Sequence, residues 1–403
     1  MNGPSKALQI AEGIYWVGAI DWAIRDFHGY QTPRGSTYNA YLVLADKVTL
    51  IDTVKAAFKQ EMLSRIASVV APESISYIVS NHAELDHTGC LPEVIEAVRP
   101  EKVFASRAGV KALGAHFHSD REIVPVAEGE TLSLGNRNLS FIESRMLHWP
   151  ESMMTYVPDA GVLFSQDVFG MHLATSERFA DEIDEAILHW EAAKYYANIL
   201  LPLSPIVTKF LGKLAKLELP IKLAACDHGP IWRDGGLERI AGLYAEWAAQ
   251  KPTNKAVVVY DTMWGSTAKM AAAIGEGLAS GGASVKLMQL RARHRSDIAT
   301  EVLDAGALIV GSPNLNNNLF PTVADVLTYL KGLRPQNLIG AAFGSYGWND
   351  AVPKQLAGIL EEMKVELVAE PVTVNFVPDS EALGKCHELG VRVAERLREV
   401  CEE

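Results

Sequence analysis

The C-terminal part of the chain alternates short apolar runs with segments of helical spacing. Apolar runs cover residues 256–260, 285–289, 307–310 and 338–343, and helical spacing appears near residues 269–280, 323–330 and 352–363. Unbroken apolar runs are typical of parallel strands that are buried on both faces. The repeated strand–helix order therefore predicts an α/β fold with a doubly wound parallel sheet over residues 254–403.

The N-terminal part has a different pattern. Up to about residue 250, short β-like runs (38–44, 48–51, 103–105 and 163–165) alternate with loops, and residues 237–249 have helical spacing. The segment Gln250-Lys-Pro252 then breaks the pattern, because proline does not continue a helix easily. A chain of 403 residues suits two domains, and we expect them at residues 1–250 and 254–403.

Charge and cysteine usage exclude several classes of function. The net charge of −12 argues against nucleic-acid binding, which relies on basic surface. No apolar run approaches the length that spans a bilayer, and the N-terminus lacks the apolar core of a signal peptide. The four cysteines are scattered without CxxC spacing, as expected for reduced thiols in a cytoplasmic protein. They form no four-cysteine iron site, so any electron carrier of that type must be a separate protein.

The densest candidate chemistry is the segment His82-Ala-Glu84-Leu-Asp86-His87, which follows an apolar run at residues 75–80. A predicted strand, a ligand-rich loop and then a helix is how α/β folds place chemistry at the carboxyl ends of strands. Two imidazoles and two carboxylates, without a thiolate, favour a harder metal ion than a structural zinc site would bind.

Three later segments each add one candidate ligand beside apolar residues. They contain His148 (before Trp149), Asp167 (in Phe164-Ser-Gln-Asp167) and His228 (after Cys226-Asp). Seven ligands are too many for one tetrahedral ion but suit two metals that share a carboxylate. Asp167, which lies between apolar neighbours, is the predicted bridge.

Three loops of the C-terminal part follow predicted strands and carry groups that could bind a ligand. The first combines hydroxyl groups, a glycine and a helix start, which together can cradle a phosphate. It resembles the flavodoxin phosphate loop, which holds the single phosphate of flavin mononucleotide (FMN), although taken alone it would be read as a simple Ser/Thr helix cap. The other two offer the aromatic and amide groups that a planar isoalloxazine ring needs. The predicted FMN-binding residues are Thr262, Met263, Trp264, Gly265, Ser266 and Thr267, then Pro313, Asn314, Leu315, Asn316 and Asn317, and finally Ser345, Tyr346, Gly347 and Trp348.

The order of the metal-ligand motifs resembles the metallo-β-lactamase fold, whose zinc members carry a second histidine where this chain has Glu84. That replacement is the signature of the flavodiiron protein family, which holds two non-haem irons on the same scaffold. Segments 25–30, 37–43 and 194–198 also resemble this family. The resemblance implies a metallo-β-lactamase-like αββα sandwich followed by a flavodoxin-like domain. It also implies that His28 and Tyr195 lie near the irons without binding them.

The family reduces dioxygen to water, nitric oxide to nitrous oxide, or both, with electrons that pass through FMN. The resemblance therefore implies an oxidoreductase with a diiron centre and FMN. It further implies a separate electron donor, most commonly rubredoxin, and a head-to-tail homodimer or a dimer of dimers. Two points stay open: the preference between the two gases, and whether His87 binds iron or leaves its place to water. The donor is also open, because a reduced deazaflavin or an NAD(P)H-linked partner would serve.

Two other classes of protein would explain parts of this sequence. A zinc-dependent hydrolase of the metallo-β-lactamase superfamily, with an accessory flavin domain, would use a metal-bound hydroxide. Glu84 and the fused flavin domain argue against it. A non-catalytic electron shuttle would explain the flavodoxin-like half but would leave seven metal ligands without a role. In addition, the family usually shows Thr-His or Thr-Tyr where this chain has Asn314-Leu315, so the flavin contacts there are less well defined by the resemblance.

Overall fold

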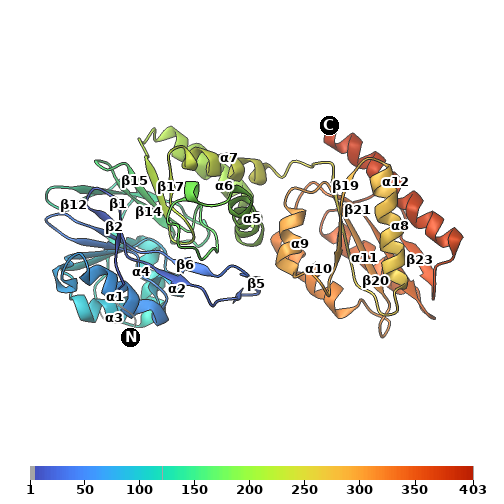
Figure 1. Ribbon diagram of the computed structural model, residues 1–403, viewed down its shortest axis with the longest axis horizontal. Coiled ribbons are helices and arrows are strands. Elements are labelled where there is room, and N and C mark those ends of the chain that lie inside the picture. Colours follow the sequence, from blue (N-terminus) through green and yellow to red (C-terminus); the bar gives the residue numbers. More distant parts are fainter. Residues whose placement is uncertain (1–4, 120, 403) are drawn as a thin grey trace. The chain divides into compact units, whose positions relative to one another are not determined.

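The computed structural model describes residues 5–119 and 121–402, which form two compact units. The first unit holds the chain up to His28 together with Thr32–Tyr195 and Pro205–Ala245. The second holds Gly29–Gln31, Tyr196–Ser204 and the chain from Glu246 onward. Both are mixed α/β units (Figure 1).

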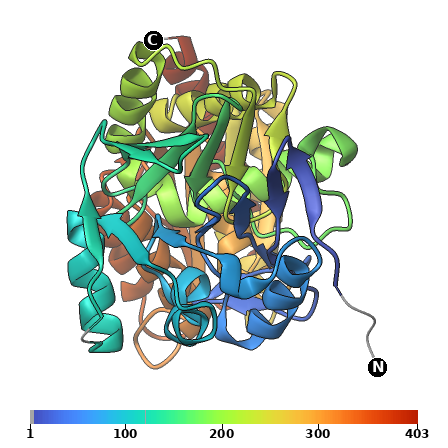
Figure 2. The same cartoon turned by 90° about the vertical axis from the view of Figure 1, so that its left-hand side faces the viewer.

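The first sheet of the first unit has seven strands within the described residues, in the order β1-β2-β7-β8-β9-β10-β11. Its strands are β1 (Leu8–Ala11), β2 (Ile14–Trp16), β7 (Tyr41–Val43), β8 (Thr49–Ile51), β9 (Tyr77–Ser80), β10 (Lys102–Ser106) and β11 (Val124–Val126). The helices that accompany it are α1 (Lys59–Ala67), α2 (Leu85–Thr88), α3 (Leu91–Val98) and α4 (Arg107–Phe117). Figure 2 draws these helices in blue to cyan.

The second sheet has six strands in the described chain, in sequence order from β12 to β17. They are β12 (Thr131–Ser133), β13 (Asn138–Glu143), β14 (Met153–Val157), β15 (Val162–Gln166), β16 (Leu223–Cys226) and β17 (Trp232–Arg233). The helices of this half are α5 (Glu185–Tyr195), α6 (Ser204–Lys216) and α7 (Gly236–Ala249). The π-helical turn Tyr196–Leu200, which follows α5 in the chain, is part of the second unit. Tyr244 on α7 accepts a hydrogen bond from the backbone N–H of Phe169, 3.0 Å away, which ties α7 to the end of this sheet.

Alternating side chains explain why the two sheets and their helices form layers. On β8 and β9, Leu50 and Ile78 pack with helix residues such as Val94, whereas their neighbours Ile51 and Val79 pack in a separate core. That second core also contains Phe141 and Phe164 of the second sheet, so it lies between the sheets. Successive strand residues point to opposite faces, so each buried strand of the first sheet serves two cores. The result is the αββα sandwich that the resemblance implied. Two short two-stranded sheets are separate from these: β3 (Ala19–Asp21) pairs with β6 (Ser36–Tyr38), and β4 (Asp26–Phe27) pairs with β5 (Tyr30–Gln31).

The second unit is a parallel sheet in the order β19-β18-β20-β21-β22, with β23 also paired to β21. Its strands are β18 (Lys255–Tyr260), β19 (Ser284–Gln289), β20 (Ala307–Pro313), β21 (Ile339–Tyr346), β22 (Glu366–Leu367) and β23 (Val372–Asn375). Its helices are α8 (Ser266–Ser280), α9 (Arg295–Val302), α10 (Pro321–Leu333), α11 (Ala351–Glu362) and α12 (Ser380–Glu402). Helices α8 and α12 lie on one side of the sheet and α9 and α10 on the other (Figure 1). The order, with the first strand between the second and third, is that of a flavodoxin-like doubly wound sheet.

The structure differs from the sequence-based expectations at several elements. The run at residues 38–44 is not one strand, because the buried Asn39 interrupts it and donates to the backbone carbonyls of Cys226 and Gly229 at 2.7 and 3.0 Å. The polar stretch after β19 contains α9, which was not expected. Helix α12 was not expected either, and α8 begins three residues earlier than the pattern at residue 269 indicates.

Two further findings concern the helices and the cysteines. In the part of the chain that the structure describes, no helix is both long and apolar enough to cross a membrane. All four cysteines lie within the described residues and carry free thiols.

Candidate metal and cofactor sites

The seven predicted metal ligands lie together in the first unit, and they form two groups around one carboxylate. His82, Glu84, His148 and Asp167 make one group, in which the donor atoms lie within 4.8 Å of one another. Asp86, His87 and His228 make the other. Such spacing suits two metal ions held side by side.

Asp167 faces both groups with different oxygen atoms. Its Oδ2 atom lies 3.3 Å from Nε2 of His82 and 3.0 Å from Nε2 of His148. Its Oδ1 atom lies 3.2 Å from Nε2 of His87 and 3.5 Å from Nε2 of His228. A carboxylate in this orientation can give one oxygen to each of two metals, which is what the predicted bridge requires.

The ligands come from strand ends and from one short helix. His82 and Glu84 follow β9, His148 lies between β13 and β14, Asp167 directly follows β15, and His228 follows β16. Helix α2 begins at Leu85, inside the segment expected to be a loop, so Asp86 and His87 sit on its first turn. The edges of both sheets therefore contribute to a single buried site.

Several of these donor atoms have no other partner. Among the described residues, both oxygens of Asp86, both ring nitrogens of His87 and Oδ1 of Asp167 are buried without a hydrogen bond of acceptable geometry. Unpaired buried polar groups are costly, and charged ones more so. Hard oxygen and imidazole donors without thiolates fit iron or another first-row metal, so the residues present fit a diiron centre.

The charged groups crowded into this cluster shift one another's pKa values. Burial alone would lower the pKa of His87, but Asp86, Asp167 and Asp227 raise that pKa to about 10. Burial would raise the pKa of Glu84, but its hydrogen bonds with His148 and His82 lower that pKa to about 2. The pKa values of Asp86 and Asp167 are lowered as well, so these carboxylates are held in the ionised form that metal binding needs. The pKa values of His82 and His148 are raised like that of His87, so a metal must displace protons from these three imidazoles.

The two residues expected beside the metals differ in their exposure. Tyr195 is buried, with its ring centroid 6.2 Å from that of His228. The side chain of His28 is 78% exposed, and its Nε2 atom lies 3.7 Å from Oε1 of Glu84.

Sequence reasoning missed three buried groups that surround the ligands. The ring of His172 lies 4.7 Å from that of His228 and is hydrogen-bonded to the hydroxyl of Ser36 at 2.8 Å. The carboxylate of Glu151 contacts His82, and that of Asp227 lies behind His87. Each is close to a ligand motif in sequence, but its direction relative to the ligands depends on the fold. Of the three, only His172 could have been found from the sequence, because it lies among apolar residues, as Asp167 does.

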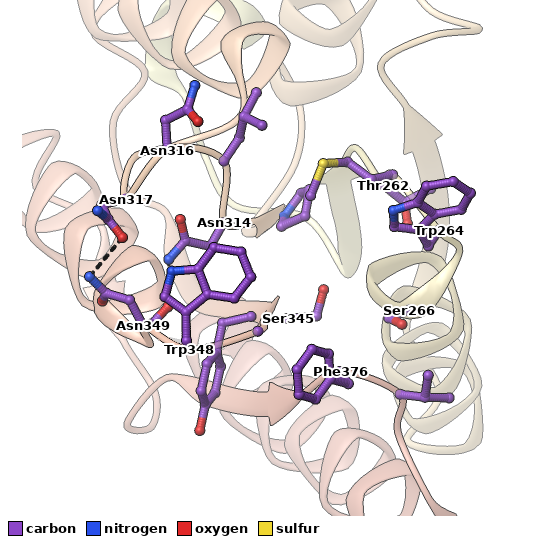
Figure 3. A pocket seen from close by; sticks show the side chains of 16 residues that line it. Thr262, Trp264, Ser266, Asn314, Asn316, Asn317, Ser345, Trp348, Asn349 and Phe376 are labelled. Atoms are coloured by element: carbon purple, nitrogen blue, oxygen red, sulfur yellow. Dashed lines mark hydrogen bonds between the residues drawn. The ribbon is translucent and has the colours of Figure 1, made fainter.

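The three FMN loops of the second unit surround a cavity of about 650 Å³ (Figure 3). Thirteen of the fifteen predicted residues line it, and Gly265 and Thr267 do not. Asn349, Phe376 and Val377 also line it and were not predicted.

The two predicted residues outside the lining shape the first loop. Gly265 precedes α8 with a φ of 89°, a conformation that is strained for other residues. Thr267 is buried, and its hydroxyl is hydrogen-bonded to that of Ser345 at 2.9 Å, which joins the first loop to the third. The helix start with its free N–H groups fits a phosphate.

Two tryptophans at this cavity are almost fully exposed. Trp264 is 94% exposed and Trp348 is 89% exposed, and Figure 3 shows them on opposite sides of Ser345. The exposed Phe376 and Val377 line the same cavity, and exposed apolar side chains that gather in one place often mark a ligand site. A planar aromatic ligand in the cavity would cover their faces, so the residues present fit the isoalloxazine of FMN.

Comparisons with known proteins agree with this architecture. A family model described as "ODP family beta lactamase" matches residues 37–229, and the flavodoxin model matches residues 258–390. The chain is 48% identical to a nitric oxide reductase of Moorella thermoacetica over 398 residues, which covers 98% of this chain and 99% of that protein. It is 50% identical over 376 residues to the rubredoxin-oxygen oxidoreductase of Megalodesulfovibrio gigas, which covers 93% and 94% of the two chains.

Solved structures give the same answer over the whole chain. The rubredoxin oxygen:oxidoreductase from the anaerobe Desulfovibrio gigas superposes with a TM-score of 0.97 at 47% identity, covering 99% of this chain and 100% of that one. The flavodiiron protein from Giardia intestinalis gives a TM-score of 0.95 at 33% identity, covering 100% and 99%. These likenesses span both units, and the chain belongs to the flavodiiron protein family.

Proposed function

We propose that this chain is a flavodiiron reductase, which passes electrons through FMN to a non-haem diiron site and reduces dioxygen to water, nitric oxide to nitrous oxide, or both. The observation that carries the proposal is the Asp167 carboxylate, with one oxygen toward each of two thiolate-free ligand groups. The same polypeptide carries a flavodoxin-like unit with an FMN-sized cavity. The names of the relatives in Moorella thermoacetica and Megalodesulfovibrio gigas support nitric oxide and oxygen as substrates.

We assign the metal ligands by group. His82, Glu84 and His148 would hold one iron, Asp86, His87 and His228 would hold the other, and Asp167 would bridge them. When bound, a ferrous pair supplies electrons to a diatomic gas, which is chemistry that no side chain can supply. The surrounding residues have a simpler role: the buried Tyr195 and His172 beside His228 exclude bulk water from that side of the cluster.

Further parts of the proposal concern partners and organisation. The name of the Megalodesulfovibrio gigas relative supports rubredoxin as the electron donor. The four free thiols in the described residues are scattered and offer no rubredoxin-type iron site. We further propose a cytoplasmic protein, a domain boundary between residues 250 and 254, and a head-to-tail homodimer or a dimer of dimers.

Composition and gas reactivity together test the function. Purified protein should contain about two irons and one FMN per chain, and the anaerobically reduced protein should be reoxidised rapidly when mixed with dissolved oxygen or nitric oxide. Two zinc ions with hydrolase activity would instead support the hydrolase, and FMN without any metal would support the electron shuttle. Comparing the two gases in stopped-flow experiments would decide the substrate preference.

A further inference from the structure

The outward-facing nitrogen atoms of the ligand histidines have different partners. In His82, Nε2 faces the metal cluster, and Nδ1 donates to Oε1 of Glu151 at 2.8 Å. The same oxygen accepts a hydrogen bond from the backbone N–H of Ala83 at 3.0 Å. Glu151 is only 4% exposed, so this charged contact is shielded from water.

The other histidines lack an equivalent contact. His228 donates from Nδ1 to the backbone carbonyl of Thr37 at 2.6 Å, which is a neutral acceptor. Nδ1 of His87 lies 3.5 Å from Oδ2 of Asp227, and neither atom makes a hydrogen bond in the described chain. His82 is thus the one ligand histidine, among the described residues, whose outer nitrogen is hydrogen-bonded to a carboxylate.

Glu151 is held rigidly for such a contact. Its backbone carbonyl accepts a hydrogen bond from the hydroxyl of Ser106 at 2.6 Å. That hydroxyl also caps α4 by accepting from the backbone N–H of Gly109 at 2.9 Å. The backbone of Glu151 is therefore anchored to the end of β10 and the start of α4.

We infer that Glu151 is a positioning residue, which fixes the tautomer of His82 and strengthens this imidazole as a metal ligand. With Nδ1 protonated and bound to a carboxylate, Nε2 keeps its lone pair for the metal, and the ring becomes a better electron donor. The metal held by His82, Glu84 and His148 is then bound more tightly, and its oxidised state is favoured. The two metals consequently differ in affinity and in reduction potential. The inference rests on the proposed function, because it takes the cluster to hold two metals.

Metal binding to the full-length protein tests this without relying on turnover. Co²⁺ would be titrated into metal-free wild type, Glu151→Gln and Glu151→Ala, with visible absorption and chelator competition as readouts. Glutamine can still accept both hydrogen bonds but carries no charge. We expect Glu151→Ala to weaken one of the two Co²⁺ sites about 10–100-fold, the usual effect of removing such a partner. Glu151→Gln should weaken the same site less, and the second site should be unchanged in both variants.

A matched control makes the same loss of charge at another glutamate that accepts a backbone hydrogen bond and is no candidate ligand. Glu130 accepts a hydrogen bond from the backbone N–H of Ala127 at 2.9 Å in an exposed turn, so Glu130→Gln should leave both sites unchanged. In iron-loaded protein, Glu151→Gln should raise the reduction potential of one iron. Mössbauer spectra of samples poised at set potentials would measure this change.

The outcomes are distinct. Equal Co²⁺ affinities and unchanged potentials in Glu151→Gln and Glu151→Ala, with only a lower melting temperature, would overturn the inference and leave Glu151 as a support for the Ala83 backbone. Failure of the wild type itself to bind two metals would count against the proposed function, and therefore against the basis of the inference.

Discussion

The Glu84 carboxylate lies 3.2 Å from Nε2 of His148, with Oε2 facing the ring. Glu84 stands where zinc members of the metallo-β-lactamase fold carry a second histidine, so this pair brings an anionic oxygen donor and an imidazole to the same metal position. An added negative charge stabilises a more highly charged ion. The pair therefore provides the most direct test of metal identity.

Glu84→His should shift the metal preference from iron toward zinc, because an imidazole replaces a hard anionic oxygen. We expect gas reduction to fall at least about tenfold, the loss seen even for residues that only support ligands. Metal analysis after growth with equal iron and zinc would measure the shift. Glu177→His, at an exposed position, is the control. Unchanged iron content and turnover in Glu84→His would remove Glu84 from the ligand set.

His87→Asn should deplete one iron more than the other. His87 belongs to the group with Asp86 and His228, and its Nε2 atom points toward Asp167. Mössbauer spectra of ⁵⁷Fe-loaded protein would show whether one of the two iron signals decreases. Full and equal occupancy would mean that water serves in place of this ring, which is the alternative left open by the sequence.

Trp348→Ala should weaken FMN binding about tenfold, because an aromatic stacking contact with a planar base contributes about 1–3 kcal/mol. Quenching of FMN fluorescence during titration of flavin-free protein would measure the dissociation constant. Trp22 is 57% exposed and does not line the cavity, so Trp22→Ala is the matched control. Equal affinity in the two variants would place the isoalloxazine away from Trp348.

Metal-free protein should lose stability between about pH 7 and pH 10. The pKa of His87 is raised from 6.5 to about 10 in the folded state, so the folded state binds its proton more strongly than the unfolded state does. The stabilisation that the bound proton of His87 gives to the folded state is complete below pH 6.5, and it is lost as the pH rises through 10. The pKa values of His82 and His148 are raised as well, so these residues steepen the decrease of the free energy of unfolding with rising pH.

Urea denaturation of metal-free protein at several pH values would measure this slope. It should be shallower in His87→Asn and nearly absent in metal-loaded protein, where the metal has displaced the protons. A slope that is identical in metal-free wild type and His87→Asn would contradict the assignment to His87.

The sequence supported the strand–helix order and the identity of the candidate ligands, because both follow local rules. Apolar runs predict buried strands, and residues after strand ends tend to meet at one edge, as His82, Asp167 and His228 do. The division of the seven ligands into two groups was not predictable, because it depends on which oxygen of Asp167 faces which ring.

The same limit applies to the residues that sequence reasoning missed. Glu151 comes close to His82 only because β9 and the segment before β14 end near each other in the sandwich. Helix α9 was not predicted because most of its residues are polar. Its N-cap is His294, whose side chain accepts a hydrogen bond from the backbone N–H of Ser296. Such side-chain to backbone contacts become visible only when the fold is known.

The scattering of the ligands along the chain, from the loop after β9 to the loop after β16, sets the order in which the protein can mature. A nascent chain that has not yet emerged as far as His228 lacks a donor for one metal position, and both sheets must be joined before Asp167 can face both groups. Metal insertion is therefore expected after folding of this unit. Once inserted, the ions would bind the native chain in preference to the unfolded one. They would thereby link the two sheets and increase the free energy of unfolding.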